Sequence, residues 1–231
     1  EQSWQPLAPS AVALADGWLV PKEMDEHDMA RTRQAFVDAA LRALAAGFEI
    51  VEIHMAHGYL LHSFLSPLSN FRTDAYGGSL DARMRYPLEV ASAVRAALPA
   101  GTPLFVRISS EDGFEGGWTM DDSVVLAREL LACGVDVIDC SSGGNTPRGA
   151  TNANLQRAPG YQVPFARRIR AEARILSEAV GLIRDGLHAE EILQDGGADL
   201  IAVGRQFLFD PFWALHAAHQ LGIDPDFKLW P

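Results

Sequence analysis

The chain alternates, five times over, between a segment with apolar residues at helical spacing and a short segment rich in strand-forming residues. The first pair is "RTRQAFVDAALRALAAG" (31–47), which ends at a glycine as many helices do, and "FEIVEIHMA" (48–56). The later pairs are helix 80–98 with strand 103–109, helix 121–134 with strand 135–142, helix 165–173 with strand 175–183, and helix 188–198 with strand 199–205, before a last helix over 210–222. This alternation predicts an α/β fold with a parallel sheet covered by helices. Pro87 is expected in the first turn of its helix or at a kink.

The glycines and polar residues near the strands distinguish between two kinds of parallel sheet. A doubly wound nucleotide-binding sheet carries a GxGxxG turn after its first strand, and neither "HMAHGYL" nor "RISSEDG" has that pattern. Residues suited to a site instead end several different strands, namely His54, Arg107, Ser141, Gly181 and Gly204–Arg205. A site assembled from many strand ends is typical of a (β/α)8 TIM barrel, which we therefore predict.

A complete TIM barrel has eight strands in about 250 residues. This chain has 231 residues and five predicted units. We expect it to supply about five βα units, strands 4–8, with three strands preceding residue 1. Residues 1–30, which contain three prolines, are predicted to form a leader or excursion loop, and residues 31–231 the C-terminal part of a single barrel domain. Residue 1 is Glu and no signal-like apolar run follows it, so we expect a piece of a longer chain.

Composition excludes several classes of function. The net charge of −11 disfavours nucleic acid as a partner, and no run of 18 apolar residues predicts a membrane span. Cys133 and Cys140 lack metal-ligand spacing and are typical of reduced thiols in a cytoplasmic protein. The two lysines, Lys22 and Lys228, lie outside every predicted strand, which argues against a Schiff-base aldolase.

Three titratable rings, His54, His57 and Tyr59, lie within six residues at the end of the first strand. Because side chains alternate along a strand, the apolar Ile53 faces the helices and His54 points into the barrel. The residues after the strand are expected to form a solvent-facing loop. Two alternatives remain for the histidines: a structural pair that caps the loop, and a metal site, which lacks an evident third ligand.

The next strand, "LFVRIS", places Arg107 on the barrel-facing side with Phe105 and Ser109. An arginine in an apolar strand needs an acidic or oxygen-rich partner. That partner is either Glu52, in an internal ion pair, or a ligand that accepts hydrogen bonds or carries negative charge.

The last two strands end in "AVGLI" and "AVGRQF". Gly181 and Gly204 would let a ligand approach the backbone, and Arg205 adds a positive charge. The loops after the final two strands are the usual phosphate site of TIM barrels, so these three residues are predicted to bind phosphate.

The segment "HMAHGYLLHSFLSPLSNFRTDAYGGSLDARMRY" (54–86) resembles the signature segment of the old yellow enzyme family of FMN-dependent ene-reductases. The later segments "PLFVRIS", "GVDVIDCSSG", "PGYQVPFA" and "LIAVGRQFLFDPFWA" follow in the same order as in the bacterial, thermophilic-like branch of that family. The resemblance runs from "WQPLAPSA" to about Leu221 and covers the later two-thirds of a family member.

The resemblance implies a role for each predicted site residue. His54 and His57 would donate hydrogen bonds to the substrate's carbonyl oxygen, and Tyr59 would donate the proton. Arg107 would lie beside the N1 and O2 edge of the flavin, while Gly204 and Arg205, with Gly181 beside them, would bind the FMN phosphate. NADPH or NADH would be the reductant and an enone or enal the substrate of a homo-oligomeric enzyme.

Two positions depart from the family pattern. Ser177–Glu178 stand where relatives are usually small or apolar, and the tail "PDFKLWP" lacks an arginine that some relatives insert into a neighbour's active site. Two other functions are kept as alternatives. One is a flavin barrel of the 2,4-dienoyl-CoA reductase and amine dehydrogenase group, whose clustered cysteines are absent from this sequence. The other is a catalytically inert partial barrel.

Overall fold

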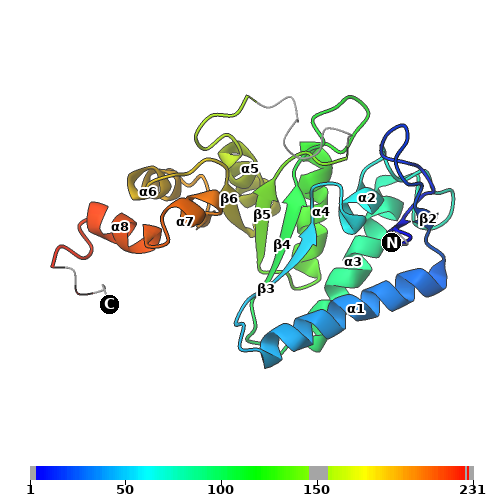
Figure 1. Ribbon diagram of the computed structural model, residues 1–231, viewed down its shortest axis with the longest axis horizontal. Coiled ribbons are helices and arrows are strands. Elements are labelled where there is room, and N and C mark those ends of the chain that lie inside the picture. The colour runs from blue at the N-terminus through cyan, green and yellow to red at the C-terminus, as the bar shows by residue number, and fades with distance from the viewer. Residues whose placement is uncertain (1–3, 146–155, 227, 229–231) are drawn as a thin grey trace.

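The computed structural model describes residues 4–145, 156–226 and 228. Its main sheet has five parallel strands: β3 (Val51–Met55), β4 (Leu104–Ser109), β5 (Val137–Ser141), β6 (Leu176–Val180) and β7 (Leu200–Ala202). Each strand pairs with the next one along the chain, in the order β3-β4-β5-β6-β7 (Figure 1). A doubly wound sheet reverses its strand order at a switch point, whereas strands of a barrel follow one another. The observed order is that of consecutive barrel strands.

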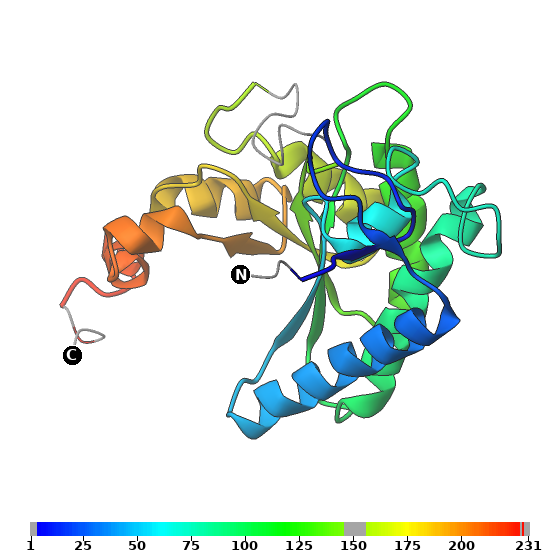
Figure 2. The same cartoon turned by 45° about the vertical axis from the view of Figure 1, so that its right-hand side comes forward.

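Helices precede and follow these strands. They are α1 (Glu26–Ala45), α2 (Leu60–Leu65), α3 (Leu80–Ala97), α4 (Met120–Ala132), α5 (Val163–Ala173), α6 (Gly186–Gln194), α7 (Arg205–Phe209) and α8 (Trp213–Gln220). Helices α1, α3 and α4 lie along one side of the sheet, and neighbouring helices contact each other (Figures 1 and 2). No helix in the described part of the chain is long and apolar enough to cross a membrane.

Burial along the strands shows which face the helices cover. Ile53 and Met55 of β3 and Val106 and Ile108 of β4 are buried in one continuous core. The residues between them, such as Arg107, remain more accessible on the opposite face. The predicted alternation is therefore confirmed, and the polar side chains point toward the inside of the barrel.

Helix α1 begins five residues before the predicted start at residue 31, because Asp25 forms an N-terminal cap. The Asp25 carboxylate accepts from the Asp28 backbone N–H at 2.8 Å, and the Asp28 carboxylate accepts from the Asp25 N–H at 3.4 Å. This reciprocal pair is a capping box built from two aspartates.

The expectation of a solvent-facing loop after β3 is wrong at residues 60–65, which form α2. Leu61, Phe64 and Leu65 are fully or almost fully buried, with the spacing of one helical face. Of the two expected places for Pro87, the first turn of its helix is excluded, because Pro87 lies buried in the middle of α3.

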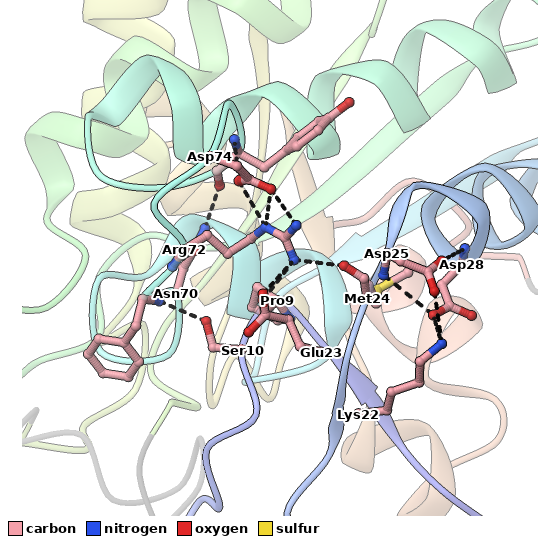
Figure 3. A network of polar contacts seen from close by, with 12 residues as sticks. Pro9, Ser10, Lys22, Glu23, Met24, Asp25, Asp28, Asn70, Arg72 and Asp74 are labelled. Carbon is pink, nitrogen blue, oxygen red and sulfur yellow. Dashed lines mark hydrogen bonds and ion pairs between the residues drawn. The ribbon is translucent and has the colours of Figure 1, made fainter.

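The leader is tied to the barrel by Arg72 (Figure 3). The Arg72 guanidinium donates to the carbonyl oxygens of Pro9 (3.0 Å) and Met24 (2.8 Å) and to the carboxylate of Asp74 (3.0 Å). The Phe71 N–H adds a bond to the Ser10 hydroxyl at 2.9 Å. Two two-residue strands, β1 (Leu7–Ala8) and β2 (Lys22–Glu23), pair in parallel within the leader. Arg72 thus holds the leader at two places, near its start at Pro9 and near its end at Met24.

Candidate active site

A tight turn at the end of β3 carries the candidate catalytic rings. His57 and Gly58 both have left-handed backbone conformations, with φ of 61° and 77°. The strained His57 is held because its N–H donates to Ser109 Oγ at 2.9 Å. A Cβ on Gly58 would lie 2.3 Å from the carbonyl oxygen of Gly144, and a Cβ on Gly144 would lie 2.1 Å from the His57 carbonyl carbon. The two backbones therefore approach closely, and both positions require glycine.

The turn brings the three predicted rings together. The ring centroids of His54 and His57 are 5.1 Å apart, and those of His54 and Tyr59 are 5.3 Å apart. Tyr59 is 65% exposed, so its hydroxyl is open to an incoming molecule. Among the described residues, no carboxylate, thiol or third imidazole joins both histidines within metal-binding distance.

His57 is a neutral base in this environment. Burial, the positive charge of Arg107 and the neighbouring imidazoles lower the pKa of His57 to about 4. Its Nε2 lies 2.6 Å from Ser141 Oγ. Burial first, and then Arg107, also lower the pKa of His54. Each ring is therefore expected to offer one N–H donor near neutral pH.

Because the pKa of His57 is lowered in the folded protein, we expect the free energy of unfolding to decrease as the pH falls. The unfolded state binds a proton at this residue below about pH 6.5, and the folded state only below about pH 4, so stability is lost as pH falls through that window. Thermal unfolding of the protein between pH 7 and pH 4 should show a steeper decline than in His57→Gln. If the unfolding temperature declined equally with falling pH in both proteins, His57 would not have a lowered pKa in the folded state.

A cavity of about 540 Å³ opens beside the turn, on the barrel-facing side of the sheet. It is lined by five of the predicted site residues: His57, Arg107, Gly181, Gly204 and Arg205. His54 and Tyr59 do not line it, but their rings adjoin His57. The structure thus places all seven predicted residues in or next to one region.

The two glycines in this cavity differ. A Cβ on Gly181 would lie 2.9 Å from the Tyr161 ring, so contact with that ring already explains the glycine. A Cβ on Gly204 would meet nothing within 4 Å, which leaves open space beside the backbone. Space for a ligand is therefore found at Gly204, next to Arg205.

Arg107 pairs with Asp139 rather than with Glu52, the acidic partner considered from the sequence. Arg107 Nε lies 3.1 Å from Asp139 Oδ2 on the adjacent β5. Burial raises the pKa of Asp139 to about 7, with Arg107 opposing the rise and Glu52 and Glu178 adding to it. Strand alternation could have revealed Asp139, since it precedes Ser141 by two residues and shares its face.

Sequence reasoning also missed Gln162, at the start of α5. Its Oε1 accepts from Ser142 Oγ at 2.6 Å, and its Nε2 donates to the Val180 carbonyl oxygen at 3.0 Å. Gln162 lines the cavity and connects the ends of β5 and β6. No periodic signal marks such a loop residue in the sequence.

Comparison with known proteins identifies relatives for nearly the whole chain. The family model described as NADH:flavin oxidoreductase / NADH oxidase matches residues 6–224. The NADPH dehydrogenase of Geobacillus sp. (strain WCH70) is 50% identical over 216 residues, which are 94% of this chain and 62% of that protein. The NADPH dehydrogenase of Bacillus subtilis (strain 168) is 48% identical over 218 residues, with the same shares covered.

Solved structures share the fold. A 2-naphthoyl-CoA reductase in complex with 2-naphthoyl-CoA superimposes with a TM-score of 0.83 and 26% identity, over 94% of this chain and 33% of that one. Morphinone reductase in complex with tetrahydroNAD gives a TM-score of 0.75 and 26% identity, over 95% of this chain and 60% of that one. The predicted partial TIM barrel is confirmed.

This chain spans 62% of the length of the two NADPH dehydrogenases. The matched region includes the turn with His54, His57 and Tyr59 and the cavity with Arg107 and Arg205. The chain therefore belongs to the NADH:flavin oxidoreductase / NADH oxidase family, the family of the old yellow enzymes.

Proposed function

We propose that this chain is part of an FMN-dependent NAD(P)H oxidoreductase that reduces the C=C bond of α,β-unsaturated carbonyl compounds. The observation that carries the proposal is the cluster of His54, His57 and Tyr59 beside a cavity containing Arg107 and Arg205. The function proposed for the whole enzyme is that of an NADPH dehydrogenase, or ene-reductase, with NADPH or NADH as reductant.

The cavity suits FMN in size and in charge. Its volume of about 540 Å³ lies within the roughly 300–1,000 Å³ common for ligand sites. Arg107 Nε lies 3.1 Å from Asp139 Oδ2, but this buried nitrogen has no hydrogen-bond partner among the described residues. Arg205 makes no ion pair within the described part of the chain, and it lies beside the open space at Gly204. Arg107 would bind the flavin edge, while Gly204 and Arg205, with Gly181 nearby, would bind the phosphate.

Bound FMN would supply the hydride for the β-carbon of the alkene. His54 and His57 would each donate one N–H to the carbonyl oxygen, which gains negative charge as the β-carbon is reduced. For Nε2 of His57 to make this bond, the substrate oxygen must replace Ser141 Oγ as its partner. Tyr59 would deliver a proton to the α-carbon, because a phenol is protonated at neutral pH and this hydroxyl is accessible.

The two alternatives are less well supported. Relatives described as NADPH dehydrogenases are 48–50% identical to the chain, whereas the 2-naphthoyl-CoA reductase and a histamine dehydrogenase from Rhizobium sp. 4-9 are 26% and 27% identical. An inert partial barrel would have no reason to keep three rings together beside a cavity lined by Arg107 and Arg205. We further propose that the enzyme is cytoplasmic, because Cys133 and Cys140 are free thiols, and that it is a homo-oligomer, as the family resemblance implies.

The proposed function is tested by supplying FMN, NADPH and 2-cyclohexenone to the whole enzyme of which this chain is part. NADPH consumption with formation of equimolar cyclohexanone is the expected result. Flavin binding and NADPH oxidation without any loss of the enone would contradict the proposed substrate class.

Arg205→Ala should weaken FMN binding about ten- to a hundredfold, because a charge-assisted contact to phosphate contributes about 1.5–3 kcal/mol. The chemistry of the flavin that remains bound should change little, since the phosphate is remote from the reacting ring. Titration of the apoprotein with FMN, followed by fluorescence, measures the affinity. Arg167→Ala, which removes an exposed arginine on α5, is the matched control. Equal affinity in the two variants would contradict the phosphate assignment.

A further inference from the structure

A histidine outside the proposed machinery lies directly behind the catalytic turn. His62, in α2, is fully buried, and its Nδ1 accepts the Gly58 backbone N–H at 2.9 Å. Its other nitrogen, Nε2, lies 3.2 Å from Oδ1 of the fully buried Asp112. By strict geometry neither Nε2 of His62 nor Oδ1 of Asp112 has a hydrogen-bond partner among the described residues, so the two atoms face each other at ion-pair distance. The two side chains thus form an isolated buried pair that ends on the backbone of the turn.

Asp112 is held as a carboxylate. Its Oδ2 accepts from Ser66 Oγ at 2.5 Å and from the Trp118 N–H at 2.7 Å. Burial by itself would raise the pKa of Asp112, but the nearby His62 and the bonds from Ser66 and the Trp118 N–H outweigh burial and lower it. Both carboxylate oxygens therefore face donors, and Oδ1 faces His62.

This arrangement fixes the tautomer of His62. Because Nδ1 accepts a backbone N–H, it carries no proton, and the single proton of the neutral ring is on Nε2, facing Asp112. A proton on Nδ1 would direct one N–H against the Gly58 N–H. The carboxylate and the backbone amide thus select the same form of the ring.

The anchored amide lies at the centre of the turn. Gly58 separates His57 from Tyr59, and His57 has the unfavourable left-handed conformation. The His57 N–H is held by Ser109 at 2.9 Å and the Tyr59 N–H by the Ala56 carbonyl at 3.2 Å. The Gly58 N–H is held by His62 Nδ1, so the backbone amides of all three turn residues, 57–59, have an acceptor.

We propose that Asp112 and His62 are a positioning pair, which sets the turn so that His57 and Tyr59 reach the same substrate molecule. This inference rests on the proposed function and adds to it two residues that do not touch the substrate. A shift of about 1 Å in a catalytic group can reduce a rate about 100-fold, so a backbone anchor of this kind can control turnover.

Asp112→Asn tests the pair with little change in shape. The amide oxygen must face Ser66 Oγ and the Trp118 N–H, since both are donors, and the amide NH₂ must then face His62 Nε2. The ring should respond by moving its proton to Nδ1, where it opposes the Gly58 N–H. We expect turnover of 2-cyclohexenone by the FMN-loaded whole enzyme to fall about 10- to 100-fold. The fall should be in kcat, with FMN affinity unchanged.

Two measurements separate positioning from general instability. Nitrogen-15 NMR of the imidazole should find His62 protonated at Nε2 in the parent and at Nδ1 in Asp112→Asn. Hydrogen exchange of the Gly58 amide should accelerate in the variant. His62→Asn, whose side-chain oxygen can occupy the place of Nδ1, should retain slow exchange and part of the activity. Tyr86→Phe, which removes a buried hydrogen bond to the Met29 carbonyl, is the control for lost stability and should turn over normally.

A parent protein with the His62 proton on Nδ1 would overturn the proposal, even if no variant folds. So would Asp112→Asn with parental exchange at Gly58 and parental turnover. Reduced turnover in Asp112→Asn with an unchanged His62 tautomer would overturn it as well. If the parent binds FMN but does not reduce the enone, the proposed function fails, while the NMR and exchange measurements still decide whether the pair holds the turn.

Discussion

Tyr59→Phe should slow reoxidation of the reduced flavin by 2-cyclohexenone about 10²–10⁴-fold, the usual cost of losing a general acid. The ring is 65% exposed and the change removes only its hydroxyl, so folding and FMN binding should survive. Reduction of the flavin by NADPH needs no proton from this residue and should stay within a few-fold of the parent. Rapid-mixing absorbance of each half-reaction measures the two rates separately.

Tyr76→Phe, the same change in a tyrosine outside the cavity and the catalytic turn, is the control. Adding His57→Ala to Tyr59→Phe should slow enone reduction further and weaken binding of a phenol, whose oxygen resembles the charged oxygen of the reacting substrate. If Tyr59→Phe is reoxidised by enone as fast as the parent, another group donates the proton.

The second large effect concerns the two edges of the sheet. Within the described residues, β3 and β7 each have a strand neighbour on one side only. Exposed apolar side chains lie near both edges, including Phe48 before β3 and Leu208 and Phe209 after β7. Unpaired strand edges with apolar neighbours favour aggregation. We expect the 231-residue chain alone to aggregate and to hold much less than one equivalent of FMN.

Co-expression with a fragment carrying the three strands expected before residue 1, taken from a relative, should restore solubility and FMN binding. The matched control is the same fragment with charged residues on the strand that would pair with β3. Stoichiometric FMN in a monomer of the 231-residue chain alone would contradict this expectation.

Much of this architecture follows from local patterns. The position of His54 and Arg107 on the barrel-facing side needed only the alternation of side chains along a strand, and burial of Ile53 and Val106 confirms it. The grouping of Arg107, Gly204 and Arg205 followed from the convergence of parallel strand ends. Short-range periodicity was sufficient for these features because each strand contributes one or two residues in a fixed direction.

Other features depend on contacts between segments far apart in sequence. Asp139 rather than Glu52 pairs with Arg107, because both neighbouring strands offer an acid and only the three-dimensional geometry selects one. The helix α2 has six residues, too few for a periodic signal, and it forms because its apolar side chains are buried by the surrounding core. The pairing of His62 with Asp112 joins residues on either side of α3 and β4, which no spacing rule predicts.

Return of the oxidised flavin spectrum in the absence of oxygen would show that the enone itself accepts the electrons of the reduced flavin. The FMN-loaded whole enzyme is reduced with one equivalent of NADPH under anaerobic conditions and mixed rapidly with 2-cyclohexenone. We expect the visible band of oxidised flavin to return within the time of a turnover and one equivalent of cyclohexanone to form. A flavin that stays reduced in the presence of the enone, and recovers its colour only when oxygen is admitted, would contradict the account.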